Sequence, residues 1–263
     1  MNRYTSTEDE AIAINYVLDR INGDLNRAPY APFRIELAGS VEKNTFNEGI
    51  SDIDLRAVTT NGALLDYSPK VAKRLIMKQI RSIDEVKNPR VGHQAVTLIK
   101  GGHEYQIIPV IRHNGKTYIP SERGTYWKTV DIEAFNRSLH SLNKKTNGHF
   151  CEAVRFVKIL SDMYVPKRNQ LSGYHIESIA MEAIRNCSPT MGRTDMVEKI
   201  LRYIPSRVKS YSWDITKETK AIDHDLGSNY SAERKDAAKS YHRLKDMFAR
   251  LRKTKDDSIL DEL

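Results

Sequence analysis

Two aspartates one residue apart, Asp52 and Asp54, follow a Gly39-Ser40 pair in the stretch LAGSVEKNTFNEGISDIDLRAV. Residues two apart on a strand point to the same face, so the two carboxylates would lie side by side. Like charges so placed repel each other, and the pair is favourable mainly when a cation lies between them. Carboxylate oxygens suit Mg²⁺, which keeps several waters and shares the phosphates of its substrate. The spacing therefore predicts a site for Mg²⁺ or Mn²⁺ at Asp52 and Asp54.

The Gly39-Ser40 pair adds a possible phosphate contact to this metal pair. Glycine lets the backbone approach a phosphate closely, and the Ser40 hydroxyl can donate to its oxygens. Alone, an Asp-x-Asp pair is usually two solvated residues at a strand end, and Gly-Ser alone is less specific still. In this order, on a strand–turn–strand frame, the two motifs together indicate binding of nucleotide phosphates.

The elements that would position these residues form a sheet in the first half of the chain. Alternating or continuous apolar runs predict strands over residues 33–37, 52–58, 95–99, 105–111 and 117–119. Apolar residues at helical spacing predict helices over residues 6–27 and 68–83. On the strand that carries the aspartates, Ile53 and Leu55 would point into the core.

The second half reads as helical, because strand signals stop after about residue 125. Helices are predicted over residues 152–163, 175–186, 194–204 and 231–252. We therefore expect an α+β protein with a mixed-sheet lobe at residues 1–125, a helical lobe at residues 126–263, and a ligand cleft between them.

Several motifs together resemble the nucleotidyltransferase fold of the DNA polymerase β superfamily. They are the Gly-Ser and Asp-x-Asp run followed, in order, by YQIIPVI, VRFVKIL, LSGYHIESIA and IDHDLGSNYSAERKDAAKS. The resemblance covers roughly residues 6–252. It is nearest to the branch that holds bacterial cyclic-oligonucleotide synthases, oligoadenylate synthases and CCA-adding enzymes.

The resemblance implies roles for further residues. Gly39 and Ser40 would hold the triphosphate of an incoming nucleotide such as ATP or GTP. Lys158 would neutralise phosphate charge, although a solvated helix lysine is an equal alternative. Ser172 would contact the nucleotide, and Tyr174 would stack on its base unless it is a buried aromatic residue.

Two neighbours of Tyr174 are interpreted structurally. Glu177 in this segment more often supports the helical lobe than it takes part in chemistry. His175, among apolar neighbours, is expected to be a core histidine with its hydrogen bonds satisfied.

Two positions depart from the family pattern: the usual Gly-Thr step after Gly-Ser is Asn44-Thr45 here, and the more serious departure is at Gln106. The third catalytic carboxylate, which completes a metal site and helps to deprotonate the acceptor hydroxyl, is replaced here by Gln106. A glutamine offers a neutral oxygen and is no general base. Glu104 lies on the same strand face, but roughly 6–7 Å away along the strand.

Two functions therefore stay open. The first is a metal-dependent nucleotidyltransferase that moves a nucleotidyl group from an NTP to a hydroxyl of a second nucleotide, an RNA end or a protein. The second is a catalytically degenerate relative that binds nucleotide or RNA as a sensor or as a subunit of a complex. A plain RNA-binding module, based on the basic helix at residues 231–252, ranks last.

The composition indicates which partners and which cellular compartment to expect. The net charge of +8 suits a phosphate-rich partner such as tRNA, but it also suits ordinary surface solubility. Cys151 and Cys187 have no metal-binding spacing and are expected to be reduced core thiols. No apolar run reaches membrane-spanning length and the start MNRYTSTEDE lacks a signal-peptide core, so we expect a cytoplasmic protein with no membrane partner.

Overall fold

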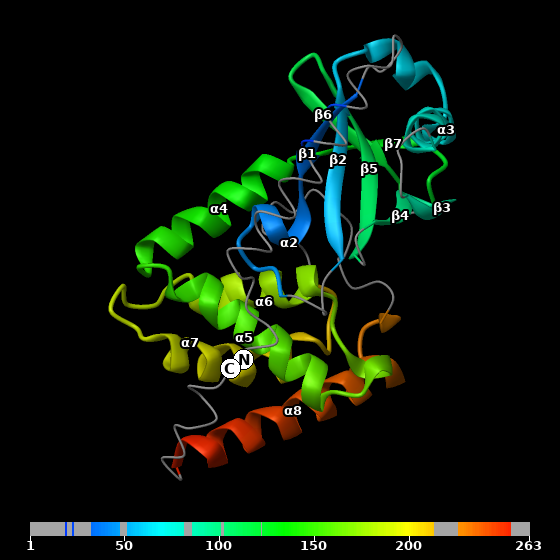
Figure 1. The fold of residues 1–263 in the computed structure, drawn as a ribbon. Coiled ribbons are helices and arrows are strands. Elements are labelled where there is room, and N and C mark those ends of the chain that lie inside the picture. Colours follow the sequence, from blue (N-terminus) through cyan, green and yellow to red (C-terminus); the bar gives the residue numbers. More distant parts are fainter. Residues whose placement is uncertain are drawn as a thin grey trace. The chain divides into compact units, whose positions relative to one another are not determined.

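The computed structural model of the chain describes residues 33–47, 52–81, 86–100, 103–121, 123–212 and 226–253, together with positions 19 and 23. Contacts divide the chain into two units, which we call the sheet unit and the helical unit (Figure 1). The sheet unit holds residues 33–42 and Asp52–Ile132, and the helical unit holds residues 43–47 and the described residues from Glu133 onward. The sequence predicts the boundary between the two lobes near residue 125. That each lobe is a separate domain stays a prediction.

The sheet unit is built on a mixed, seven-stranded sheet. Its strands are β1 (Arg34–Leu37), β2 (Ile53–Thr59), β3 (Lys87–Val91), β4 (Val96–Lys100), β5 (His103–His113), β6 (Lys116–Pro120) and β7 (Trp127–Val130). The order is β1-β2-β5-β4-β3, and β6 pairs with both β5 and β7. Only the pairing of β2 with β5 is parallel among these described strands. The mixed sheet expected from the sequence is confirmed.

Alternation along β2 explains how this strand serves two purposes. Ile53 and Leu55 are 1% and 0% exposed, as expected for core residues. Between them, Asp54 is only partly buried. The period of two thus keeps apolar side chains inside and leaves the carboxylate at the surface of the unit.

Three short helical segments complete the sheet unit. They are α2 (Gly39–Glu42), the 3₁₀ turn η1 (Gly62–Asp66) and α3 (Pro69–Ile80). Helix α3 begins with a proline at its first position, which suits an N-terminus, and it packs against β3, β4 and β5 (Figure 1). It ends at Ile80, before the residue 83 that periodicity predicts.

The helical unit contains five longer helices within the described residues: α4 (Ile132–Lys145), α5 (His149–Tyr164), α6 (Gly173–Ile184), α7 (Arg193–Arg207) and α8 (Ala232–Lys253). Helix α7 contacts α5, α6 and α8, and one apolar cluster fills the space between them. Cys151 and Cys187 lie in this core as free thiols, which confirms the expectation, and burial raises the pKa of the Cys151 thiol to about 11. In the part of the chain described here, no helix is both long and apolar enough to cross a membrane.

Three sequence expectations need correction or fall outside the structure. The expected end of strand structure near residue 125 is wrong, because β7 pairs with β6 from Thr117↔Val130 to Pro120↔Trp127. Helix α4 was not expected, although Phe135, Leu139 and Leu142 form an apolar stripe that packs against the core. The helix expected over residues 6–27 falls almost wholly outside the described residues.

Candidate functional site

The acidic pair lies at the start of β2. Asp52 directly precedes the strand and is exposed, whereas Asp54 is partly buried. Strand geometry places both on one face, because residues i and i+2 of a strand point the same way. The sequence prediction of two neighbouring carboxylates agrees with this placement.

Gly39 packs directly against Asp54. The backbone of Gly39 has a φ of 58°, and a Cβ built there would lie 1.9 Å from Asp54 Oδ2 and 2.6 Å from its Cγ. The preceding residue, Ala38, donates its N–H to the Asp54 carbonyl at 3.0 Å. Only glycine fits at residue 39, since any side chain would displace the carboxylate.

Ser40, the residue after Gly39, has a side-chain hydroxyl with no hydrogen-bond partner among the described residues. The residue is 8% exposed, so this hydroxyl is buried. Leaving a buried hydroxyl unpaired costs on the order of 1–3 kcal/mol. An oxygen-rich ligand at the Gly39-Ser40 turn would supply the missing partner.

Arg56 anchors the turn that carries Gly39 and Ser40, and sequence reasoning missed it. Its guanidinium donates to Glu42 Oε1 at 2.5 Å and to the Leu37 carbonyl at 3.0 Å. The side chain is 6% exposed although it is charged. Glu42 ends α2, so this arginine ties both ends of the Gly-Ser turn to β2. The sequence shows an arginine two residues after Asp54 on the same strand, but neither its burial nor its partners.

The third position of the site holds an amide that contacts Asp52. The parallel register of β2 and β5 pairs Asp54 with Gln106. Gln106 Nε2 donates to Asp52 Oδ2 at 2.6 Å. The amide therefore orients Asp52 by donating a hydrogen bond to its carboxylate, whereas a carboxylate at residue 106 would repel Asp52.

Glu104 forms an ion pair with an arginine side chain. Arg90 of β3 donates to both Glu104 oxygens, at 2.9 and 3.0 Å. Burial raises the pKa of Asp52, the nearby Glu104 charge raises it further, and the Gln106 hydrogen bond and the Arg90 charge only partly oppose this. The surroundings of Asp52 therefore disfavour its ionised form, and a bound cation would favour that form instead.

The residues fit a cation that is shared with a substrate. In the described residues, no group of three or more His, Cys, Asp or Glu side chains is arranged to hold a metal ion. Mg²⁺ is commonly bound through one or two carboxylates plus substrate phosphates. Asp52 and Asp54, with the phosphate-accessible Gly39-Ser40 turn, match that donor set and do not match an all-protein metal cage.

Lys158 lies in a buried charge network of the helical unit. Its ammonium group donates to Glu177 Oε1 at 2.8 Å, to the Thr45 carbonyl at 3.0 Å and to Thr45 Oγ1 at 3.2 Å. Lys43 forms a second ion pair with Glu177, and all four residues are at most 7% exposed. Three acceptors match the three protons of a lysine ammonium group. The solvated-lysine alternative is therefore wrong, and the role of Lys158 as a phosphate ligand stays a prediction.

Glu177 is the centre of this network. Burial alone would raise the pKa of its carboxyl, but Lys158 and Lys43 lower it to about 2. Glu177 therefore stays ionised and joins the segment at residues 43–47 to α5 and α6. The expectation that it supports the helical lobe is confirmed.

The other predicted nucleotide contacts have partners within the helical unit. Ser172 caps α6 by accepting from the His175 N–H at 3.2 Å. The Tyr174 ring packs on Phe135 at 4.7 Å between centroids, and the Lys43 ammonium lies 5.1 Å from it. His175 is 2% exposed and its Nε2 lies 3.2 Å from Ser212 Oγ, so its interpretation as a satisfied core histidine is confirmed.

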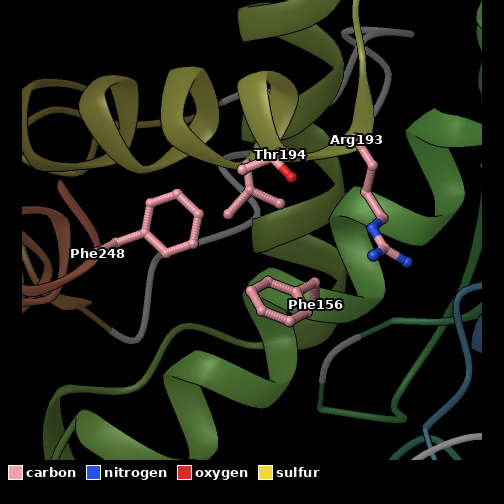
Figure 2. Close-up of a pocket in the computed structure, with 5 residues that line it drawn as sticks. Phe156, Arg193, Thr194 and Phe248 are labelled. Carbon is pink, nitrogen blue, oxygen red and sulfur yellow. The ribbon is translucent and has the colours of Figure 1, made fainter. Parts of the chain in front are cut away.

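A small cavity in the helical core is not a candidate for nucleotide binding. It measures about 10 Å³ and lies among Phe156, Thr194 and Phe248, which Figure 2 shows with Arg193. The two phenylalanine rings meet edge to face at 6.3 Å. A space of this size holds one water at most.

Comparison with known proteins supports the fold. The chain matches no protein-family model and no curated protein sequence. Solved structures do match it. One is Elizabethkingia meningoseptica CdnE cyclic dinucleotide synthase with GTP and Apcpp, with TM-score 0.67 and 14% identity over 89% of this chain and 91% of that one.

Two further structures cover the chain to a similar extent. Vibrio cholerae DncV, a cyclic AMP-GMP synthase, has TM-score 0.71 and 10% identity over 94% of this chain and 86% of that one. E. coli MS115-1 CdnC, in complex with HORMA-deltaN, has TM-score 0.71 and 14% identity over 94% and 87%. The chain therefore shares the fold of these bacterial cyclic dinucleotide synthases.

Proposed function

We propose that this protein is a metal-dependent nucleotidyltransferase that moves a nucleotidyl group from an NTP to a hydroxyl acceptor. The observation that carries the proposal is the fit of Gly39 against Asp54, which leaves no room for any side chain. A carboxylate held against a glycine turn, with Asp52 on the same face, places two negative charges where a cation and a phosphate can bind.

Each residue of the sheet unit has a distinct task in this proposal. Asp52 and Asp54 hold Mg²⁺ or Mn²⁺, which when bound would stabilise the charge that develops on the transferring phosphoryl group. Gly39 admits the triphosphate to the backbone, and the Ser40 hydroxyl donates to a phosphate oxygen. Arg56 keeps this turn in place through Glu42.

The structural relatives support ATP or GTP as the nucleotide. The Elizabethkingia protein was solved with GTP and Apcpp, and the Vibrio protein is a cyclic AMP-GMP synthase. By that likeness, the acceptor is the hydroxyl of a second nucleotide. The alternative acceptors are an RNA end and a protein side chain. The E. coli protein was solved in complex with HORMA-deltaN, and by that likeness this protein would also bind a partner protein.

Gln106 limits the expected rate. An amide that donates to Asp52 cannot take a proton from an acceptor hydroxyl. General-base help is typically worth about 10²–10⁴-fold. We therefore assign Gln106 to positioning Asp52, and expect slow transfer unless the substrate brings its own base.

A second candidate, a binding protein without catalysis, is favoured by the same contact. With Gln106 on Asp52 and Arg90 on Glu104, neither side chain is available as a base. Such a protein would bind nucleotide or RNA as a sensor or as a subunit of a complex.

Transfer of label from each α-³²P-labelled NTP decides between the two. The protein is incubated with Mg²⁺ or Mn²⁺, with and without total tRNA, and small and large products are resolved separately. Product that disappears in Asp52→Ala and persists in Asp66→Ala, a control outside the site, supports the enzyme. Metal-dependent binding of NTP without any product supports the binding protein.

A further inference from the structure

A second pocket lies within the helical unit, where the end of α7 meets α8. Helices α7 and α8 contact each other, and the pocket between their surfaces has a volume of about 320 Å³. Its lining residues are Pro205, Lys209, Lys235, Ala238, Lys239 and His242. This space is large enough for a small molecule, since ligand pockets run from about 300 to 1,000 Å³.

The basic side chains are brought together by two elements. Lys235, Lys239 and His242 follow each other at four and three residues along α8, so they lie on one face of the helix. Lys209 comes from the turn after α7. Ala238, which is 4% exposed, leaves space between the lysines.

The three lysines of this pocket carry charge that no described carboxylate offsets, whereas His242 lies 3.5 Å from Asp246 Oδ2. No acidic residue lines it, and Lys209, Lys235 and Lys239 form no ion pair with any described residue. Other cations of the same unit are paired. Arg207 donates to Glu182 at 2.7 Å, and Arg252 to Asp195 at 3.0 Å.

We propose that the pocket binds a small molecule with two or more phosphate groups, independently of the nucleotidyltransferase site. Like charges at i and i+4 of a helix destabilise it, and a bound anion would remove that cost. Lysine binds phosphate as a point charge, so three separate ammonium groups suit several phosphates.

The same lining excludes readout of a base. Among the lining side chains, only His242 has an aromatic face on which a base could stack, and such stacking tolerates every base. The pocket therefore recognises the polyphosphate and does not distinguish adenine from guanine. The space of about 320 Å³ fits one small polyphosphate, and an RNA strand is the alternative that the titration below distinguishes.

Calorimetric titration of the full-length protein in EDTA tests this proposal. Tripolyphosphate, ATP and GTP should bind with similar affinity. The double variant Lys235→Ala/Lys239→Ala should weaken all three by about tenfold or more, because it removes two of the three ammonium groups that would contact the phosphates. The control Arg243→Ala/Arg250→Ala removes the same charge from exposed positions of α8 outside the pocket, and should change affinity less than about twofold.

Three results would overturn the proposal. The first is that tripolyphosphate, ATP and GTP all fail to bind the wild-type protein in EDTA. The second is an equal loss of affinity in the two double variants, which would indicate general attraction to a basic surface. The third is a short RNA that binds and loses affinity in the lysine variant while tripolyphosphate does not bind, which would make the surface a nucleic-acid site. Circular dichroism of each variant checks that α8 remains folded.

Discussion

At the scale of single residues, the site depends on which atoms touch Asp52 and Asp54. Gly39 touches Asp54, and Gln106 touches Asp52. The first contact fixes the position of a carboxylate and the second fixes its orientation. Both contacts follow from local geometry, since the two aspartates are separated by one strand residue and Gln106 lies opposite Asp54 on the neighbouring strand.

We predict that Gly39→Ala disables the acidic site without unfolding the sheet unit. The new Cβ would overlap Asp54 Oδ2, and a shift of about 1 Å in a catalytic group costs about 10²-fold in rate. Gly115→Ala is the matched control, because Gly115 also has positive φ, at 70°, but has no atom within 4 Å of a built Cβ. Mn²⁺ affinity in the presence of ATP measures the effect. If both variants lost Mn²⁺ affinity equally, the effect would be due to backbone strain and not to contact with Asp54.

We predict that Gln106→Asp strengthens metal binding and, in an active enzyme, raises the transfer rate by up to about 10²–10⁴-fold. The change restores a negative charge beside Asp52 and removes a hydrogen-bond donor. Gln106→Asn has the same length as the aspartate but stays neutral, so it isolates the charge. Glu104→Gln should change little, because Arg90 already engages Glu104. Equal Mn²⁺ affinity in Gln106→Asp and Gln106→Asn would contradict this account of the third position.

At the scale of elements, the helical unit is held together by a charge network that local patterns do not reveal. Lys43 and Glu177 are separated by 134 residues in the sequence, and Lys158 reaches Glu177 from a different helix. Periodicity identifies α5 and α6, but it cannot pair a loop lysine with a distant glutamate. The same limit explains why the sequence does not predict that Lys158 is buried against Glu177.

We predict that Glu177→Gln lowers the free energy of unfolding by about 3–5 kcal/mol at neutral pH, because it leaves two buried lysines without their counter-ion. Glu182→Gln, which breaks the more exposed pair with Arg207, should cost under about 1 kcal/mol. Urea unfolding of both variants measures the two values. A loss in Glu177→Gln no greater than in Glu182→Gln would mean that the network is energetically neutral.

The stabilisation from Glu177 should also depend on pH. Its carboxyl has a pKa of about 2 in the folded chain and an ordinary value of 4.5, so the unfolded chain takes up a proton first as the pH falls. The stabilisation is therefore complete above about pH 4.5 and is lost between pH 4.5 and about 2. The difference in unfolding free energy between wild type and Glu177→Gln should shrink over that window. A difference that stays constant down to pH 2 would contradict the lowered pKa.

Strands with clear apolar alternation could be predicted, and irregular ones could not. Ile53, Leu55 and Ala57 of β2 are buried at every second position, so this strand and its partner β5 were found. Strand β3 reads KNPRV, has no buried residue, and contains a bulge near Asn88, whose φ is 48°. Such an edge strand forms through pairing with β4, and neither its proline nor its charges predict it.

At the scale of the whole molecule, the net charge of +8 and the fold both suit a phosphate-rich ligand. The fold and the acidic pair could be predicted from the sequence, because each depends on short motifs, and the assignment of Gln106 to the third catalytic position stays a prediction. The Arg56 anchor, the Arg90–Glu104 pair and the basic pocket at α8 required the structure, because each joins separate elements.

We predict that ATP or GTP with Mg²⁺ raises the melting temperature of the wild-type protein. A ligand that binds only the folded state at 100 times its Kd adds about 2.7 kcal/mol of stability. Asp52→Ala/Asp54→Ala should abolish the part of the shift that depends on Mg²⁺ and keep any shift seen in EDTA. No Mg²⁺-dependent shift with any of the four NTPs in the wild-type protein would count against both proposed functions of the acidic site.

The most direct test of the central claim is a crystal structure of the protein with Mn²⁺ and a non-hydrolysable ATP analogue, with anomalous data collected for manganese. We predict an anomalous peak within coordination distance of Asp52 and Asp54, with the phosphates of the analogue against Gly39 and Ser40. Soaking Asp52→Ala/Asp54→Ala crystals in the same way should give no peak there. Analogue bound elsewhere, with no manganese between the two aspartates of the wild-type protein, would contradict the account.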